Sequence, residues 1–206
     1  MPVKLNRKGR FTIILGPMFA GKSKELIRRG LAARELGEKI LALKPEIDDR
    51  YHRERIVTHS GEWLSAIPVS IWPEIPKEIS TVLLDEVQFF EKPWFLGNLS
   101  TMVTELLNNG IHVIASGLHA DWRGKEFPVV RTLCTLANET IFLTAICSVC
   151  GKPAHHTAKL GGTLEQVEIG SMDLYEPRCV EHWHVPDVPP ATMNTHPSRD
   201  FTVSIS

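Results

Sequence analysis

The sequence has no apolar run that approaches the roughly 20 residues needed to cross a bilayer. It also lacks an excess of either charge, because its formal net charge is only −1. Proteins that bind nucleic acids or anionic membranes usually carry a basic surface. The basic segment at residues 1–10 leads into a strand-like stretch that is too short for the core of a signal peptide. We therefore expect a cytoplasmic protein whose main partner is neither a nucleic acid nor a membrane.

Cysteine is scarce, with four among 206 residues, and three of them fall into a spacing typical of a metal site rather than of disulfides. The pairs Cys147-x2-Cys150 and Cys179-x2-His182 are separated by residues 151–178. Each pair can present two soft ligands from a tight turn, and two such turns close a tetrahedron around Zn²⁺. Four protein ligands leave no open position, so the pattern predicts a structural zinc site that ties a long loop at both ends.

The spacing leaves the fourth zinc ligand open. His184 is an alternative to His182, and His155 and His156, which lie inside the loop, are weaker alternatives. Cys134 falls in a helix-like stretch, where we expect a small core residue rather than a ligand.

Secondary structure is indicated by the spacing of apolar residues. Five short β-rich runs recur at residues 11–15, 40–43, 82–84, 113–115 and 141–143. Helical patterns lie between several of them, at residues 22–36, at residues 94–109 and in a helix opened by Pro128. Strands that alternate with helices favour an α/β fold in which a parallel sheet is covered on both faces.

The pattern changes after Ala145, and this change predicts the domain organisation. Residues 1–10 form an N-terminal extension, and residues 11–145 form the α/β domain. Residues 146–184 have little periodicity and much Gly, Pro and Cys, so we expect a small zinc-binding domain there. From residue 185 to 206 the chain is rich in proline without a continuing apolar pattern, which predicts a disordered tail.

One motif specifies a chemistry. The pattern G-x-x-x-x-G-K-S, placed between a predicted strand and a predicted helix, comprises Gly16, Pro17, Met18, Phe19, Ala20, Gly21, Lys22 and Ser23. Its glycines let the backbone curl so that N–H groups point at phosphate oxygens, and the helix directs its positive end at the same anion. Lys22 can reach the β- and γ-phosphates, and Ser23 can hold Mg²⁺. The fold expected is therefore a P-loop, RecA-like parallel sheet that binds ATP.

A pair of carboxylates, Asp85 and Glu86, ends the apolar run at residues 82–84. At the carboxyl edge of a buried strand beside the cradle, the first can organise Mg²⁺, which leaves the second free to accept a proton from an attacking hydroxyl or water. Both a kinase and an ATPase that acts on nucleic acid can use such a pair, so these motifs alone do not separate the two. A GTP-dependent switch is disfavoured, because the sequence has no Asn-Lys-x-Asp guanine reader.

Several segments together resemble the zinc-containing, P-loop family of thymidine kinases. The resemblance runs from about residue 11 to residue 182. Besides the cradle and the two ligand pairs, it is carried by residues 44–51 (KPEIDDRY), 85–90 (DEVQFF), 117–124 (GLHADWRG) and 170–175 (GSMDLY). It implies transfer of the γ-phosphate of ATP to the 5′-hydroxyl of thymidine, and deoxyuridine is a second candidate substrate. It also implies a homotetramer that its end product dTTP inhibits.

The resemblance also implies roles for individual residues. Glu86 corresponds to the general base, Asp85 and Ser23 to the Mg²⁺ pair, and Gln88 to a residue near the phosphates or sugar. The thymine pocket would be lined by Met18, Phe89, Leu118, Trp122 and Phe127, with Thr157 and Tyr175 contributed by the zinc-tied loop. That loop closes over the base as a lasso, largely through backbone hydrogen bonds.

The sequence departs from the family pattern at three positions. Trp122 stands where Phe is usual, His119 where Asp or Arg is common, and Ser171 replaces a glycine of the lasso. None of these changes removes a proposed catalytic group. Arg50 and Arg123 are candidates for stabilising charge during transfer, although a solvated surface arginine is the favoured interpretation of both.

Overall fold

The computed structural model describes residues 8–48, 52–58, 60–163, 165–166 and 174–185, and the structural statements below concern these residues. Six strands form one sheet in the order β5-β2-β6-β7-β1-β8, and every neighbouring pair in it is parallel. The strands are β1 (Phe11–Gly16), β2 (Ile40–Pro45), β5 (Ile67–Val69), β6 (Thr81–Leu84), β7 (His112–Leu118) and β8 (Glu139–Phe142). The predicted α/β fold with a parallel P-loop sheet is therefore confirmed.

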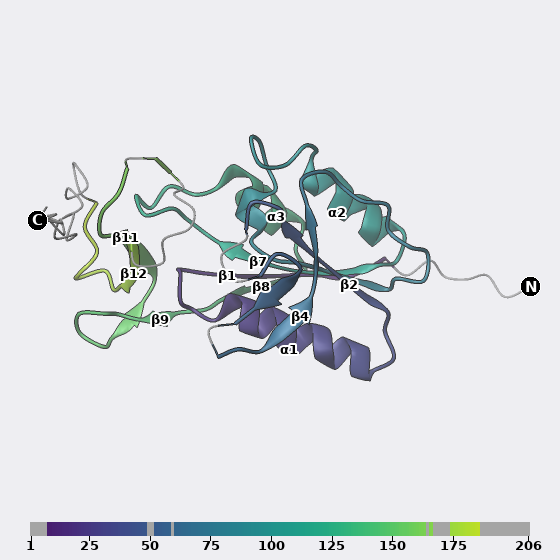
Figure 1. Ribbon diagram of the computed structural model, residues 1–206, viewed down its shortest axis with the longest axis horizontal. Helices are drawn as coiled ribbons and strands as arrows, with labels where there is room; N and C mark the ends of the chain where they lie inside the picture. Colours follow the sequence, from purple (N-terminus) through teal and green to yellow (C-terminus); the bar gives the residue numbers. More distant parts are fainter. Residues whose placement is uncertain (1–7, 49–51, 59, 164, 167–173, 186–206) are drawn as a thin grey trace, which may run out of the picture.

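Helices cover both faces of this sheet. Helix α1 (Lys22–Glu35) lies on one face, and α2 (Leu99–Asn108) and α3 (Pro128–Leu136) lie on the other (Figure 1). A 3₁₀ turn, η1 (Val87–Phe89), follows β6. None of the helices in the described part of the chain is long and apolar enough to cross a membrane.

Two hydrophobic clusters hold these layers together. Alternate residues of a strand point to opposite faces, so Ile13 and Leu15 of β1 join the cluster beneath α2 and α3, whereas Ile14 joins the cluster beneath α1. All three side chains are almost completely buried. Burial of such a side chain contributes about 1.5–3 kcal/mol, so these residues stabilise the sheet that carries the cradle.

The helix predicted at residues 94–109 begins later than expected. Gly97 has a φ of 146°, and the side chain of Asn98 caps α2 by accepting a hydrogen bond from the Thr101 N–H at 3.2 Å. Trp94 lies before this cap and packs edge-on against Phe89, with 5.4 Å between ring centroids. The apolar spacing of this segment therefore comes partly from core residues that precede the helix.

Three short strands that precede β6 were not predicted. β3 (Arg55–Val57) and β4 (Trp63–Ser65) form an antiparallel hairpin, and β5 adds to the edge of the sheet beside β2. β5 contains Pro68, which cannot donate to a ladder and is tolerated because β5 is an edge strand. Strands of three residues are too short to show a recognisable apolar pattern in the sequence.

The residues after β8 form short strands beyond the carboxyl ends of the sheet strands (Figure 1). β9 (Ala145–Ile146) pairs with β10 (Pro153–Ala154), and β11 (His156–Lys159) pairs with β12 (Tyr175–Arg178), both antiparallel. Because the carboxyl ends of parallel strands are where α/β folds place their ligands, these short strands lie over the expected site.

Candidate active site

The cradle has the backbone geometry that its glycines predict. Gly21 adopts a φ of 80° immediately before α1, and Phe19 adopts a φ of 65° at the turn of the loop. Residues other than glycine rarely adopt a positive φ, so the backbone is locally strained at Phe19. The turn delivers the backbone to the first N–H groups of α1, where an anion is stabilised by the helix dipole.

Lys22 is held inside this loop. Its side chain is 8% exposed, and its ammonium group donates to the backbone oxygen of Pro17 at 2.7 Å. The neighbouring N–H of Met18 donates to the hydroxyl of Thr157, on β11, at 3.0 Å. The cradle is thus in direct contact with β11, in the segment that follows the sheet.

Asp85 lies at the carboxyl end of β6, buried between two hydroxyl groups. Ser23 donates to its Oδ1 at 3.2 Å, and Ser116 of β7 donates a second hydrogen bond to the same oxygen. Burial, followed by the charge of Glu86, raises the pKa of Asp85 to about 6. A buried carboxylate beside a hydroxyl is a set of hard oxygen donors, which fits Mg²⁺. Ser23 and Asp85, predicted as the magnesium pair, are thus brought together.

Glu86 occupies an unusual backbone conformation. Its φ of 52° and ψ of 47° lie in the left-handed region, which costs an L-residue other than glycine about 1–2 kcal/mol. This turn ends β6 and starts η1, so the carboxylates of Asp85 and Glu86 belong to different backbone segments. Strained residues of this kind are concentrated at functional sites.

Gln88 connects Glu86 to the neighbouring strand. Its amide nitrogen donates to the Glu86 carboxylate, and its Oε1 accepts from the N–H of Leu118 at 3.0 Å. Gln88 is completely buried, and a Cβ on Gly117 would lie only 2.7 Å from its Oε1. The structure therefore gives Gln88 a role in orienting Glu86, and its contact with the phosphates or sugar stays a prediction.

The residues predicted to line the base pocket are mostly buried. Phe89, Trp122 and Phe127 are each 6% exposed or less, and Phe127 belongs to the main core against which Leu118 packs. The indole N–H of Trp122 donates to the backbone oxygen of Glu165 at 3.1 Å. Trp122 thus fastens the lid loop, defined here as residues 151–178 between the two ligand pairs, to the rest of the site.

A buried lysine organises the lid loop. Lys159 of β11 is 4% exposed, and its ammonium group donates to the backbone oxygens of Thr163 at 2.6 Å and Glu165 at 3.5 Å. The same group lies 5.6 Å from the ring centroid of Trp122 and 5.7 Å from that of Tyr175. Such a cation attracts both ring faces, so it brings two predicted pocket residues together. Residues 170–173 of the lasso motif lie outside the described part of the chain.

Arg123 makes contacts that stabilise its own loop. Its guanidinium pairs with Asp121 at 3.2 Å and lies over the Trp122 ring at 5.1 Å from the centroid. Asp121 also accepts from the backbone N–H groups of Arg123 and Lys125, both at 2.9 Å. This ion pair fits the structural interpretation of Arg123, and Arg50 lies outside the described residues.

His119 lies next to the cradle. Its ring packs edge-on against Phe142, and its Nδ1 atom is buried without a hydrogen-bond partner among the described residues. Burial lowers the pKa of His119, so its imidazole is neutral at pH 7 and adds no charge beside the phosphates.

The four predicted metal ligands converge. The ligand atoms of Cys147, Cys150, Cys179 and His182 all lie within 4.8 Å of one another. Cys150 Sγ lies 3.7 Å from Cys179 Sγ, and His182 Nδ1 lies 3.3 Å from Cys179 Sγ and 3.8 Å from Cys147 Sγ. Zn–S bonds of about 2.3 Å in a tetrahedron place sulfurs roughly 3.8 Å apart, so this Cys₃His cluster could hold a zinc ion.

The surroundings of Cys147 favour the thiolate form of its side chain. Burial opposes its ionisation, but backbone hydrogen bonds from Cys179, Cys150 and Val149 lower the pKa of Cys147 to about 6. A metal binds the thiolate, so these hydrogen bonds favour the binding form. His182, rather than His184, completes the cluster.

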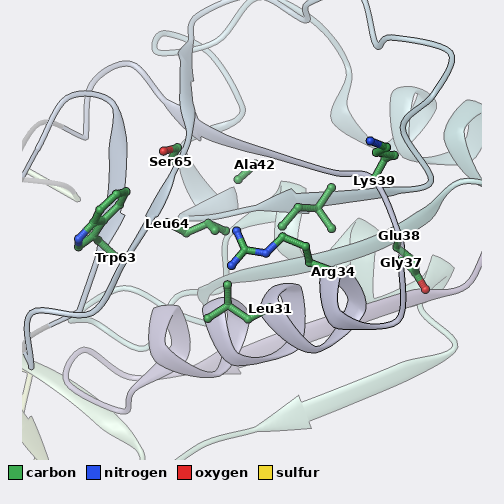
Figure 2. Close-up of a pocket in the computed structure, with 10 residues that line it drawn as sticks. Leu31, Arg34, Gly37, Glu38, Lys39, Ala42, Trp63, Leu64 and Ser65 are labelled. Atoms are coloured by element: carbon green, nitrogen blue, oxygen red, sulfur yellow. The ribbon is translucent and has the colours of Figure 1, made fainter.

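A separate groove of about 830 Å³ lies away from these residues. Its walls are the second half of α1, the start of β2 and strand β4, and Arg34 extends into it from α1 (Figure 2). The cradle includes the first two residues of α1, so the groove is at the opposite end of that helix. None of the predicted site residues lines it.

Three residues of the site escaped the sequence analysis: Ser116, Lys159 and Trp183. Ser116 is a small polar residue in an otherwise apolar strand, a signal that could have been recognised. Lys159 and Trp183 both contact Trp122, which is distant from them in sequence, so no local pattern reveals these contacts.

The sequence was compared with models of known protein families. The model described as thymidine kinase matches residues 9–183, which is most of the chain and includes the cradle, the carboxylate pair and all four ligands of the Cys₃His cluster. This match decides between the two activities that the P-loop motifs left open, in favour of a kinase. The chain belongs to the thymidine kinase family.

Proposed function

We propose that this enzyme transfers the γ-phosphate of ATP to the 5′-hydroxyl of thymidine, with Glu86 as the general base. The observation that carries the proposal is that two adjacent carboxylates have different hydrogen-bond partners. Asp85 accepts from the hydroxyls of Ser23 and Ser116, whereas Glu86, in the left-handed turn after β6, accepts from Gln88. One carboxylate is thus committed to the cation side of the site and the other can face the acceptor.

The chemistry requires little covalent help. The 5′-oxygen forms a bond to the γ-phosphorus, its proton passes to the Glu86 carboxylate, and the bond from phosphorus to the β–γ bridging oxygen breaks with its electron pair remaining on ADP. The hydroxyl loses its proton only as the new bond forms, so a carboxylate is basic enough. Catalysis then depends on positioning and on neutralising phosphate charge.

The cradle supports the donor side of this proposal. Residues 16–23 would bind the triphosphate through backbone N–H groups, and Lys22 would leave its contact with Pro17 to reach a phosphate oxygen. Ser23 and Asp85 would hold Mg²⁺, which when bound neutralises charge on the transferred phosphate.

The lid loop supports the acceptor side. Met18, Phe89, Leu118, Trp122 and Phe127 would form the walls around thymine, and Thr157 and Tyr175 would approach from the lid loop. A zinc ion at the Cys₃His cluster would fasten both ends of that loop, and a closed lid would keep water from the transferred phosphate. Phosphorylation of deoxyuridine, inhibition by dTTP, a homotetramer and a cytoplasmic location, where thiolates stay reduced, belong to the same proposal.

The test is transfer of labelled phosphate from ATP to a panel of nucleosides, with the wild type and Glu86→Gln. We expect the substitution to lower kcat by about 10²-fold or more, with ATP affinity unchanged, because a general base contributes about 10²–10⁴-fold. Glu91→Gln is a matched control, since Glu91 lies just beyond η1 and has no role in the proposal. A near-normal rate for Glu86→Gln, or an equal loss in the control, would remove Glu86 from this role.

A further inference from the structure

Trp183 follows the last metal ligand and belongs to the same turn. Its backbone N–H donates to the oxygen of Cys179 at 2.9 Å, and the N–H of His182 donates to that oxygen at 3.0 Å. Two consecutive residues thus close the turn that presents Cys179 and His182. The position of the Trp183 side chain is consequently fixed by the geometry of the metal cluster.

The indole of Trp183 contacts two separate walls of the site. Its Nε1 donates to the backbone oxygen of Trp122 at 3.2 Å, and its ring stacks on His156 with 4.2 Å between centroids and 12° between planes. The next residue, Thr157, accepts the hydrogen bond from Met18 of the cradle. One side chain therefore spans from the loop that carries Trp122 to the strand that carries Thr157.

The loop around Trp122 is shaped to receive this indole. Gly124 has a φ of 77°, and a Cβ there would lie 2.9 Å from Cη2 of Trp183. A side chain at this position would therefore be strained by the backbone and would also collide with the ring. The close approach shows that Trp183 and the turn at Gly124 are packed as a unit.

We propose that Trp183 is a positioning residue that sets the distance between the Trp122 and Thr157 walls and thereby the affinity for thymidine. The inference rests on the proposed function, because Trp122 and Thr157 are pocket residues only in that proposal. No hydrogen bond or ring contact joins Trp183 directly to the cradle or to either carboxylate in the described structure, so we expect its loss to affect thymidine more than ATP. Trp183 gives the metal turn a direct mechanical connection to the base pocket.

The test compares Trp183→Leu and Trp183→Phe in steady-state kinetics with each substrate varied. We expect Trp183→Leu, which removes both the stack and the hydrogen bond, to raise the KM for thymidine about tenfold. Trp183→Phe keeps an aromatic face for His156 and loses only the N–H donor, so it should raise that KM about threefold. The KM for ATP should stay within about twofold in both variants, with bound zinc equal to that of the wild type.

Trp63→Leu is the matched control. Trp63 is a half-exposed indole on β4, it lies over Arg55, and it lines the groove away from the site (Figure 2). Its loss should leave both KM values unchanged. A thymidine KM within about twofold of wild type in Trp183→Leu, or a parallel rise of both KM values with loss of zinc, would overturn the proposal. If Trp183→Leu does not fold, Trp183→Phe decides, and an unchanged thymidine KM in it overturns the proposal.

Direct changes in the pocket separate this inference from the proposed function. Thr157→Val and Trp122→Ala should each raise the KM for thymidine. If they do and the Trp183 variants do not, the inference about Trp183 is wrong and the pocket stands. If neither pocket variant affects thymidine, the assignment of the pocket is wrong, and the inference about Trp183 falls with it.

Discussion

The phosphate side and the nucleoside side of the site are held in different ways. The cradle and the carboxylate pair extend directly from β1 and β6, two buried interior strands of the sheet. In its described residues, the lid loop forms the short ladder of β11 and β12 and pairs β10 with β9, and the metal cluster and a few side chains fasten it. We infer that substitutions on the phosphate side impair chemistry, whereas those on the nucleoside side impair thymidine binding without disturbing ATP.

The largest effect should come from Lys22→Met. This substitution removes the buried ammonium group that, in the proposal, reaches a phosphate oxygen, and loss of one such donor costs about 10²–10³-fold in kcat. Lys24→Met is the control, because Lys24 is two residues further along α1 and its side chain is 63% exposed. Calorimetry should show unchanged thymidine binding in both variants, and weaker thymidine binding in Lys22→Met would contradict the separation of the two sides.

Replacing Cys147 with serine should produce the opposite pattern. The cluster loses a thiolate, the metal is released, and both ends of the lid loop are freed. We expect thymidine affinity to fall about 10–100-fold, while ATP affinity changes by about twofold or less. Cys134→Ser is the control, because Cys134 lies on α3 outside the cluster. Metal analysis together with two binding titrations measures both expectations, and a full complement of zinc in Cys147→Ser would refute them.

Lys159→Met should weaken thymidine binding by a smaller amount, about tenfold. It removes a charged donor to two backbone oxygens of the lid loop and the cation between the rings of Trp122 and Tyr175, but leaves the metal cluster intact. Lys77→Met, at an exposed position before β6, is the control. Equal loss of thymidine and ATP affinity in Lys159→Met would show that the two sides are not independent.

The same contrast explains how much the sequence could predict. The cradle and the Asp85–Glu86 pair are contiguous motifs attached to strands with a clear apolar pattern, so they were predicted at the positions where they lie. The four metal ligands were predicted because cysteine spacing is informative, but only the structure selects His182. The contacts that Lys159 and Trp183 make with Trp122 join segments far apart in sequence, and local sequence patterns carry no information about them.

The smallest expected effect tests the stability of the phosphate side alone. Glu25, in the first turn of α1, pairs with Arg28 at 2.6 Å and Arg29 at 2.8 Å, and its hydrogen bond with Arg28 is the main reason that its pKa falls to about 2. Glu25→Gln should lower the free energy of unfolding at pH 7 by about 0.5 kcal/mol, the value of such helix pairs. Because the folded pKa is depressed, the contribution is fully present above pH 4.5 and is lost as the pH falls towards 2.

Urea unfolding of the wild type and Glu25→Gln at a series of pH values measures this dependence. The difference between the two proteins should shrink steadily below pH 4.5, and Glu35→Gln, at the last residue of α1, should show no such trend. Since α1 begins inside the cradle, a stability loss in Glu25→Gln without any change in the KM for ATP would show that the cradle is positioned by the sheet rather than by this ion pair. A raised KM for ATP would instead make the first turn of α1 part of the nucleotide site.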